Sequence, residues 1–380
     1  MKFSVLQQDL LPSLQAVSRS VGVRSTLPVL DNILLSLEGS PRASGDARRG
    51  GAGKKLKISA TNLEIGIIKY VAVDATEEGE LTVPARTLVE LVSDIGQAKI
   101  AFEGRGEILN ITSGKFKSSV NGIAASEFPV IPLAKNGGIV FDRDTLASCS
   151  AILFASAVDE GRPVLTGVLT EVKSSSVDFV ATDGFRLAHR KVLLESAPKQ
   201  FKSLIPKKTF EEVLKILSEE NVDKITIAAS DNQNQAVFSL GETIISSRLI
   251  EGQFPSWEKI LPAKATTRIL MDKEELIRAL KLASIFAKSE ANIISLNSRK
   301  GGILLTSSAK QLGSQENEVE ASFEGEEMEV AFNGKFLLDA VANCPSSQII
   351  IELSGPLSAA LIKPVGVEGL EFIIMPVRIS

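Results

Sequence analysis

Apolar side chains recur at the spacing of one helix face near the start of three long segments of the chain. Within each segment they stand four, seven and eleven residues after the first, as in an amphipathic helix that buries one stripe. The three sets are Leu10, Leu14, Val17 and Val21, then Leu146, Ser150, Leu153 and Ala157, then Leu276, Leu280, Ala283 and Ala287. The pattern predicts three helices, each after a short strand. The helices are Asp9–Val21, Asp144–Ala157 and Lys273–Ala287, and the strands are Phe3–Val5, Ile139–Phe141 and Ile269–Met271.

A second helix is predicted later in each segment, with apolar positions at identical offsets. The matching positions are Leu88, Leu91, Val92 and Ile95, then Phe210, Val213, Leu214 and Leu217, then Leu337, Ala340, Val341 and Cys344. A run rich in branched residues follows each helix and predicts a strand, at Lys99–Phe102, Lys224–Ala228 and Gln348–Leu353. The chain is therefore predicted to contain three repeats of one α+β arrangement, with Cys344 in a core.

Two proline-rich connectors separate the repeats. Glu127–Pro132 and Gln253–Trp257 can neither continue a helix nor donate at proline to a strand ladder. We therefore predict three tandem domains, at residues 1–136, 137–264 and 265–380. In the first helix, Pro12 follows the expected cap Asp9 by three residues, which predicts a place in the first turn, where its missing N–H breaks no bond.

A turn signature recurs within the repeats. Ala181–Leu187 contains Asp-Gly and predicts a two-residue hairpin turn with positive φ angles. Ala60–Glu64 is a related stretch at the same place in the first repeat, and Thr306–Lys310 is a weaker match in the third. A structural role in turns is the principal interpretation of Asp183 and Glu64. The alternative is a repeat enzyme, a nuclease or transferase, that uses these two acids.

Composition fits a folded globular protein and excludes several chemistries. The 380 residues are 44% hydrophobic and 23% charged, with a net charge of -4 that argues against coating nucleic acid through overall charge. Cys149 and Cys344 are the only cysteines and His189 is the only histidine, which excludes a disulfide scaffold, a zinc cluster and most triad chemistry. Phosphate-loop, nucleophile-elbow and metalloprotease motifs are absent. We expect no catalytic residue, no metal site and no cofactor.

The sequence gives no sign of export or membrane insertion. Asp9 interrupts the start before a signal-peptide core forms, and the longest uncharged run, Thr145–Val158, is too short to cross a bilayer. The low cysteine content suits a reducing compartment. We expect a cytoplasmic protein with no membrane contact.

Positive charges gather on equivalent predicted helices. Arg19 and Arg24 flank the end of the first helix. Lys207, Lys208 and Lys215 belong to the second helix of the middle repeat, and Arg278, Lys281 and Lys288 lie opposite the apolar stripe of Lys273–Ala287. A solvated helix face is the ordinary role of such charges, and a shared basic surface is the alternative. The glycine-rich, basic Gly39–Lys55 is predicted to be a surface loop, with DNA contact as the alternative.

Several motifs, in order along the whole chain, resemble the beta subunit family of bacterial DNA polymerase III, the sliding clamps. They are Met1–Phe3 with Leu10-Leu11, Arg24–Leu30, Ala181–Leu187, Phe254-Pro255 to Leu261-Pro262, and Met375–Arg378. The resemblance implies an α+β chain of three clamp domains, each with two helices packed on antiparallel sheets. It implies a head-to-tail homodimer that forms a ring around duplex DNA. Such a subunit has no catalytic site and tethers the polymerase for processive synthesis.

The resemblance also implies where the chain meets DNA and its partner copy. Basic residues on the helices would contact DNA without sequence specificity, at Arg24, Lys207, Lys208, Arg278, Lys281 and Lys288. The two chains would meet through Ser118 and Val120 of the first domain and Ile285 and Phe286 of the third. A purely structural interaction protein that never meets DNA is a third interpretation.

A groove for short linear peptides is the last implied site. Its partners would be the polymerase III alpha subunit, the clamp loader, other polymerases and repair proteins. Carried over residue by residue, its lining is Leu165, Thr182, Gly184, Phe185, Arg186, Leu187, Pro255, Ile260, Ile373, Met375, Pro376, Val377 and Arg378. Apolar side chains and a methionine suit an adaptable peptide groove. Phe185 and Val377 depart from the histidine and methionine frequent in the family, which we expect to alter partner preference.

Overall fold

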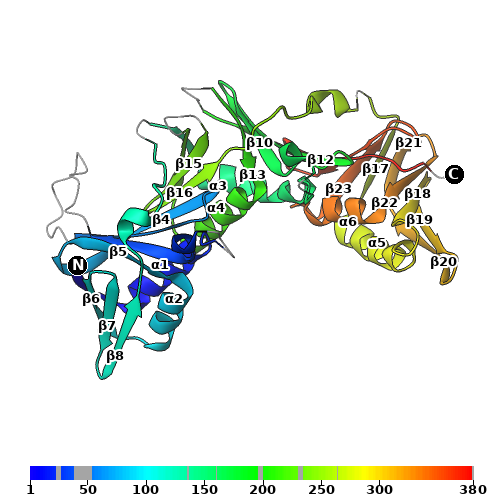
Figure 1. Ribbon diagram of the computed structural model, residues 1–380. Helices are drawn as coiled ribbons and strands as arrows, with labels where there is room; N and C mark the ends of the chain where they lie inside the picture. Colours follow the sequence, from blue (N-terminus) through cyan, green and yellow to red (C-terminus); the bar gives the residue numbers. More distant parts are fainter. Residues whose placement is uncertain are drawn as a thin grey trace. The chain divides into compact units, whose positions relative to one another are not determined.

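The computed structural model describes residues 1–22, 27–37, 54–134, 137–159, 161–195, 200–229, 234–262 and 264–378. Contacts divide the chain into two compact units (Figure 1). The first unit joins Met1–Arg143 with Glu212–Leu249, and the second joins Asp144–Glu211 with Ile250–Ser380. Predicted Arg24 and residues 39–53 of the predicted loop lie outside the described residues. Lys54 and Lys55 begin a strand and form ion pairs with Glu78 and Glu242.

The described part of the first repeat contains two α-helices and eight antiparallel strands. The helices are α1 (Gln7–Ser18) and α2 (Ala85–Asp94), which pack against each other, and α1 also packs on β3 and β4. The strands are β1 (Lys2–Leu6), β2 (Asn32–Leu37), β3 (Lys54–Thr61), β4 (Ile65–Glu77), β5 (Gly79–Pro84), β6 (Lys99–Arg105), β7 (Ile108–Ser113) and β8 (Phe116–Asn121).

The middle and third repeats follow the same order. The middle repeat contains β9 (Ile139–Asp142), α3 (Arg143–Ala147), β10 (Gly167–Val172), β11 (Ser176–Thr182), β12 (Arg186–Leu193), β13 (Phe201–Pro206), α4 (Lys207–Glu219), β14 (Lys224–Ala229), β15 (Gln235–Leu240) and β16 (Thr243–Arg248). The third contains β17 (Thr267–Asp272), α5 (Lys273–Ala287), β18 (Ile293–Arg299), β19 (Gly302–Ala309), β20 (Gly313–Glu320), β21 (Ser322–Gly325), β22 (Met328–Asn333), α6 (Gly334–Ala342), β23 (Gln348–Leu353), β24 (Ala360–Pro364) and β25 (Leu370–Ile374). Helices α5 and α6 lie side by side (Figure 1).

Strand pairing repeats as well. In each repeat the opening strand joins a meander, in the orders β1-β6-β7-β8, β9-β14-β15-β16 and β17-β23-β24-β25. Of the remaining strands, β21 pairs with β17, and the others form a second layer in the orders β5-β2-β3-β4, β13-β10-β11-β12 and β22-β18-β19-β20. Across repeats, β16 pairs with β4 and β25 pairs with β12. These joints explain why contacts group each half of the middle repeat with a neighbour, and the three domain boundaries stay a prediction.

The helix predictions are confirmed in the third repeat and partly wrong in the others. Helix α5 has the predicted bounds because Asp272 caps it, with Oδ1 accepting the Glu275 N–H at 2.9 Å. Helix α1 begins at Gln7, not after a cap at Asp9. Pro12 is consequently the sixth helical residue, beyond the first turn, and it removes one bond of the helical ladder.

The predicted helix Asp144–Ala157 is wrong beyond its first turn. Helix α3 ends at Ala147, and 3-10 turns follow at Ser148–Ala151 and Leu153–Ala155. The Ser148 and Ser150 hydroxyls donate to carbonyls three residues back, at 2.7 and 2.8 Å, which favours the tighter turn.

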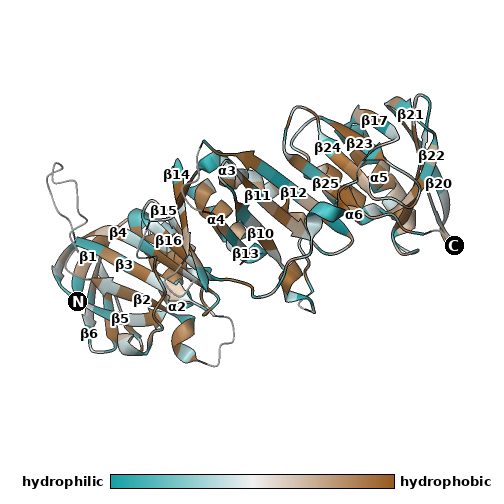
Figure 2. Cartoon of the chain, turned by 90° about the horizontal axis from the view of Figure 1, so that it is seen from above, coloured by the Kyte–Doolittle hydropathy of each residue, from teal (hydrophilic) through white to brown (hydrophobic). Residues whose placement is uncertain are grey.

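Hydrophobic residues fill the interior of both units. Strand β20 differs from the strands of the core, because most of its residues are polar and exposed. Figure 2 shows β23 and β25 as largely hydrophobic, whereas β20 is largely hydrophilic. Cys344 is buried as predicted, and burial raises the pKa of its thiol to about 12. Among the described residues, no helix combines the length and apolar character needed to cross a bilayer.

Candidate functional site

The turn between β11 and β12 is closed by two side chains. Thr182 Oγ1 accepts the Gly184 N–H at 3.1 Å and donates to the Arg186 carbonyl at 2.6 Å. Asp183 Oδ1 accepts the N–H groups of Phe185 and Arg186 at 2.9 and 3.0 Å. Gly184 has a φ of +93°, whereas Asp183 has a negative φ. The predicted two-residue Asp-Gly turn is therefore wrong, because the Asp183 carboxylate organises a longer loop.

The turn between β3 and β4 repeats these bonds. Thr61 Oγ1 accepts the Leu63 N–H at 3.0 Å and donates to the Ile65 carbonyl at 3.1 Å. Asn62 Oδ1 accepts the N–H groups of Glu64 and Ile65 at 3.0 and 2.8 Å. The predicted equivalence of the two stretches is confirmed. The third match is wrong, because Thr306 to Ala309 lie within β19.

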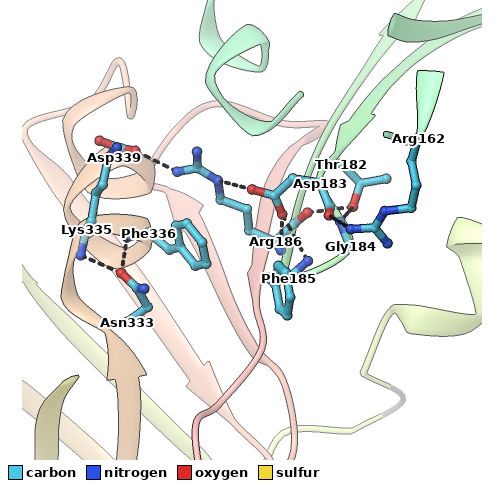
Figure 3. Close-up of polar contacts among 10 residues, drawn as sticks. All are labelled: Arg162, Thr182, Asp183, Gly184, Phe185, Arg186, Asn333, Lys335, Phe336 and Asp339. Carbon is cyan, nitrogen blue, oxygen red and sulfur yellow. Dashed lines mark hydrogen bonds and ion pairs between the residues drawn. The ribbon is translucent and has the colours of Figure 1, made fainter. Parts of the chain in front are cut away.

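Arg186 links this hairpin to helix α6 (Figure 3). Its Nε lies 2.9 Å from Asp183 Oδ2, and one terminal nitrogen lies 2.6 Å from Asp339 Oδ2. The guanidinium also lies over the rings of Phe154 and Phe336, 5.2 and 4.6 Å from their centroids. The Arg186 side chain is only 10% exposed. Its ion pairs and ring contacts therefore serve to hold the hairpin against α6. These bonds favour the structural interpretation of Asp183 over a catalytic one.

An apolar cluster lies beside the hairpin in the second unit. Leu187, Ile373 and Trp257 are buried in it, and Phe254 of the connector packs against it. The rest of its buried members are Leu169, Val180, Leu204 and Leu361. We call this cluster the floor of the predicted groove. Trp257, at the start of the turn Trp257–Ile260, belongs to the floor, and the sequence analysis did not predict it there.

Three apolar side chains of the predicted groove are exposed. Phe185 is 58% exposed, Met375 is 41% exposed and Ile260 is 37% exposed. The Met375 N–H donates to the Phe185 carbonyl at 2.9 Å, which joins two predicted groove segments. The Phe185 ring stacks on Phe336, with centroids 6.2 Å apart. Buried floor and exposed apolar rim together fit a surface that receives apolar peptide side chains.

The remaining predicted groove residues also lie in the second unit. Leu165 and Thr182 are buried, Pro376 and Val377 are half-buried, and Gly184, Pro255 and Arg378 are exposed. Pro376 bridges to Phe332, and the Val377 N–H donates to the Ala331 carbonyl at 2.8 Å. The terminal segment is therefore fixed to β22. Which of these side chains touch a ligand stays a prediction.

A buried polar group lies directly behind Trp257. The His189 ring is tilted by 42° against the Trp257 ring, with centroids 4.4 Å apart, and its Nε2 lies 2.9 Å from Asp178 Oδ1. Asp178 also accepts the Lys173 ammonium at 2.8 Å, and Glu371 Oε2 lies 3.8 Å from His189 Nδ1. Burial alone would lower the pKa of His189, but the hydrogen bond to Asp178 and the nearby carboxylates of Asp178 and Glu371 outweigh it, so the pKa is raised.

The predicted DNA-binding residues are mostly on helix surfaces. Lys208, Arg278, Lys281 and Lys288 are exposed, whereas Lys207 is half-buried. Two of the five have nearby acids: Lys207 Nζ lies 3.6 Å from Glu211, and Arg278 lies 4.0 Å from Glu275. These weak, solvated pairs leave the cations available to an external anion.

The predicted chain-to-chain residues lie on β8 and α5. Val120 is buried, Ser118 and Phe286 are half-buried, and Ile285 is 59% exposed. Sequence reasoning missed three exposed apolar neighbours, namely Phe116 on β8, Leu282 on α5 and Leu312 beside β20. Leu282 falls outside the apolar stripe of its helix, and that offset could have identified it.

Comparison with known proteins agrees with this arrangement along the chain. Family models of the DNA polymerase III beta subunit match residues 49–132 (N-terminal domain), 142–256 (central domain) and 258–378 (C-terminal domain). The chain belongs to the DNA polymerase III beta subunit family. Members of this family are beta sliding clamps, so the chain is a processivity subunit and not a catalytic one.

Relatives in this family match from end to end. The beta sliding clamp of Synechococcus elongatus is 28% identical, with all of both chains covered. That of Staphylococcus aureus is 27% identical over all of this chain and 99% of its own. Among solved structures, the DNA polymerase sliding clamp of Bacillus subtilis has a TM-score of 0.91 at 26% identity, with both chains fully covered. The DNA polymerase III subunit beta of Pseudomonas aeruginosa has a TM-score of 0.90 at 26% identity and equal coverage. The predicted α+β clamp fold is confirmed.

Proposed function

We propose that two copies of this chain join head to tail into a ring that encircles duplex DNA and tethers the replicative polymerase. The proposal is based on a strand pairing that occurs twice within the chain, between equivalent strands of neighbouring repeats. The last meander strand of one repeat pairs with a fixed strand of another, β16 with β4 and β25 with β12. The corresponding strands of the outer repeats are β8 and β20, which end their sheets in the described chain.

The register of the two internal joints is also the same. Ile65 opposes Ser247 in one joint, and Arg186 opposes Ile374 in the other. Ile65 and Arg186 are the fifth residues of the two matching turns. A third joint by this rule would place β8 of one chain against β20 of a second, and the reciprocal joint would close a two-chain ring.

The chemistry of the two open strands is complementary. Strand β20 presents exposed Glu316, Glu318 and Glu320, whereas Lys115 and Lys117 flank Phe116 on β8. Helix α5 packs on β20 and adds exposed Leu282 and Ile285. Pairing would cover these apolar groups and two strand edges that otherwise invite aggregation.

A ring explains how a protein with net charge -4 can act on DNA. Topology retains the ring, so contacts from Lys208, Arg278, Lys281 and Lys288 need only the weak affinity of non-specific binding, on the order of 10⁻⁴ to 10⁻⁶ M. Arg24 and Lys207 complete the proposed set. The site of action would be the cytoplasm, where chromosome replication takes place in bacteria.

The groove beside the Thr182–Arg186 turn would bind the linear motifs of the polymerase III alpha subunit, the clamp loader, other polymerases and repair proteins. The support is its buried apolar floor with an exposed Phe185, Ile260 and Met375 rim. Trp257 is the only tryptophan, so its fluorescence should change when an apolar peptide binds.

Retention on DNA tests the proposal. After loading, the chain should stay on a closed circular duplex and leave the same duplex within a short time once it is linearised. Equal retention on both forms would contradict encirclement and favour a protein that never threads DNA.

A further inference from the structure

A small pocket opens in the first unit beside the Thr61–Ile65 turn. Its volume is about 100 Å³, and its lining includes Leu63, Glu64, Gly66, Val130, Gln235 and Ser246. The pocket is the counterpart, within the repeat pattern, of the groove proposed for the second unit. Gly66 stands where Leu187 stands, directly after the turn, and its partner Ser246 stands where Ile373 stands.

The connectors match in the same way. Pro129 follows Phe128 in the first unit as Pro255 follows Phe254 in the second. The Ile131 side chain packs over Gly66, where a Cβ would lie 2.8 Å from its Cγ2. Ile131 therefore occupies the position equivalent to Trp257. Each of the two residues stands three positions after the phenylalanine of its own connector, Phe128 or Phe254. One architecture has therefore produced two surfaces with different chemistry.

The pocket of the first unit is lined by polar and apolar side chains, whereas the corresponding cluster of the second unit is apolar. Gly66 and Ser246 replace Leu187 and Ile373, and Ser246 donates a hydrogen bond to Gln235. A large apolar anchor therefore does not suit this cavity.

We propose that this pocket binds a basic side chain, a lysine or arginine, of an extended peptide segment. Glu64 is exposed, and none of the described cations forms an ion pair with it. Leu63 and Val130 on the rim are 51% and 91% exposed. An aliphatic stem can lie along these two side chains while its charged end reaches the Glu64 carboxylate. The proposal rests on the peptide groove proposed above, of which it is the polar counterpart.

The test uses the full chain with labelled leucine and valine methyl groups. Acetylated and amidated Ala-Arg-Ala is titrated into it, and the methyl shifts of Leu63 and Val130 are followed by NMR. We expect saturable shifts at both, and affinity lower by about fivefold for Ala-Gln-Ala and for Glu64→Gln, the loss of one charged contact. Glu77→Gln, at an exposed acid at the far end of strand β4, is the matched control and should change nothing.

Two outcomes would overturn the proposal. One is the absence of shifts at Leu63 and Val130 with millimolar peptide, and the other is an equal effect of Glu64→Gln and Glu77→Gln. Val130→Ser, at a side chain 91% exposed, gives a second variant that should weaken binding without affecting folding. An apolar peptide read out by Trp257 fluorescence tests the groove of the second unit separately, so failure of either site is distinguishable.

Discussion

The turns at Thr61–Ile65 and Thr182–Arg186 make the same four hydrogen bonds but support different surfaces. In the first unit the fifth residue is Ile65, a buried side chain, and the sixth is Gly66. In the second unit the fifth is Arg186, which pairs with Asp183 and Asp339, and the sixth is Leu187 in an apolar cluster. The comparison teaches that the repeat fixes the scaffold, whereas a few side chains next to it decide what each surface can bind.

The largest predicted effect on stability and peptide binding comes from giving the second unit a residue of the first at the base of its apolar cluster. Ile373→Ser gives the second unit the residue of the first, and it should lower the free energy of unfolding by about 4 kcal/mol through lost burial and a polar group in an apolar cluster. Binding of an apolar peptide should be lost as well. Urea unfolding and Trp257 fluorescence measure the two effects. Ser246→Ala, the control in the first unit, should change stability by about 1 kcal/mol or less.

Removing the arginine link should have the next largest effect. Arg186→Ala leaves Asp183 and Asp339 without their cation, so it should cost about 3 kcal/mol of stability. A double-mutant cycle with Asp339→Ala should give a coupling of about 1 to 2 kcal/mol. Additive effects of the two substitutions would mean that the bond between them does not hold the hairpin.

The two positive-φ residues should respond with opposite sign. Gly184 and Leu63 occupy the same place, with φ of +93° and +74°. Gly184→Ala should destabilise the chain by about 1 kcal/mol, whereas Leu63→Gly should relieve strain of similar size. Thermal unfolding of both variants checks the signs. Equal signs would mean that side-chain contacts, and not backbone strain, dominate at this position.

The smallest predicted effect is a pH dependence confined to the second unit. His189 corresponds to Ile68 in the first unit, so only the second has a titrating group behind its floor. Because the hydrogen bond to Asp178 and the nearby Asp178 and Glu371 carboxylates raise the pKa of His189 above 6.5, its stabilising contribution is complete below pH 6.5 and is lost as pH rises through the raised value. Urea unfolding between pH 6 and 9, compared with His189→Gln, should show this slope only in the unmodified chain.

Repetition made much of the fold predictable, and local chemistry limited the rest. The apolar pattern correctly located α5 and all three second helices. Because the same spacing occurs in three copies, it is unlike a chance match in a single segment. The α3 segment failed because serine hydroxyls at Ser148 and Ser150 compete for backbone carbonyls, an effect that apolar spacing does not encode. Pairing of β16 with β4 was equally hidden, because strand partners distant in sequence leave no periodic signal.

The candidate site was predictable in its members but not in their roles. Leu187 and Ile373 were expected in a groove and lie in one cluster. The contacts of Arg186 with Asp339 and the Phe336 ring could not be predicted, because these residues are more than a hundred positions apart in the sequence. Trp257 was missed because a tryptophan in a proline-rich connector gives no periodic sign of burial.

Sedimentation of the full chain tests the central claim, that β8 and β20 join two copies, most directly. The account predicts a particle of twice the chain mass. The association should weaken with added salt, because Lys117 would face the acidic β20 of the second copy, and Ile285→Glu should leave a single chain. A single chain at every protein concentration and salt, unchanged by Ile285→Glu, would contradict it.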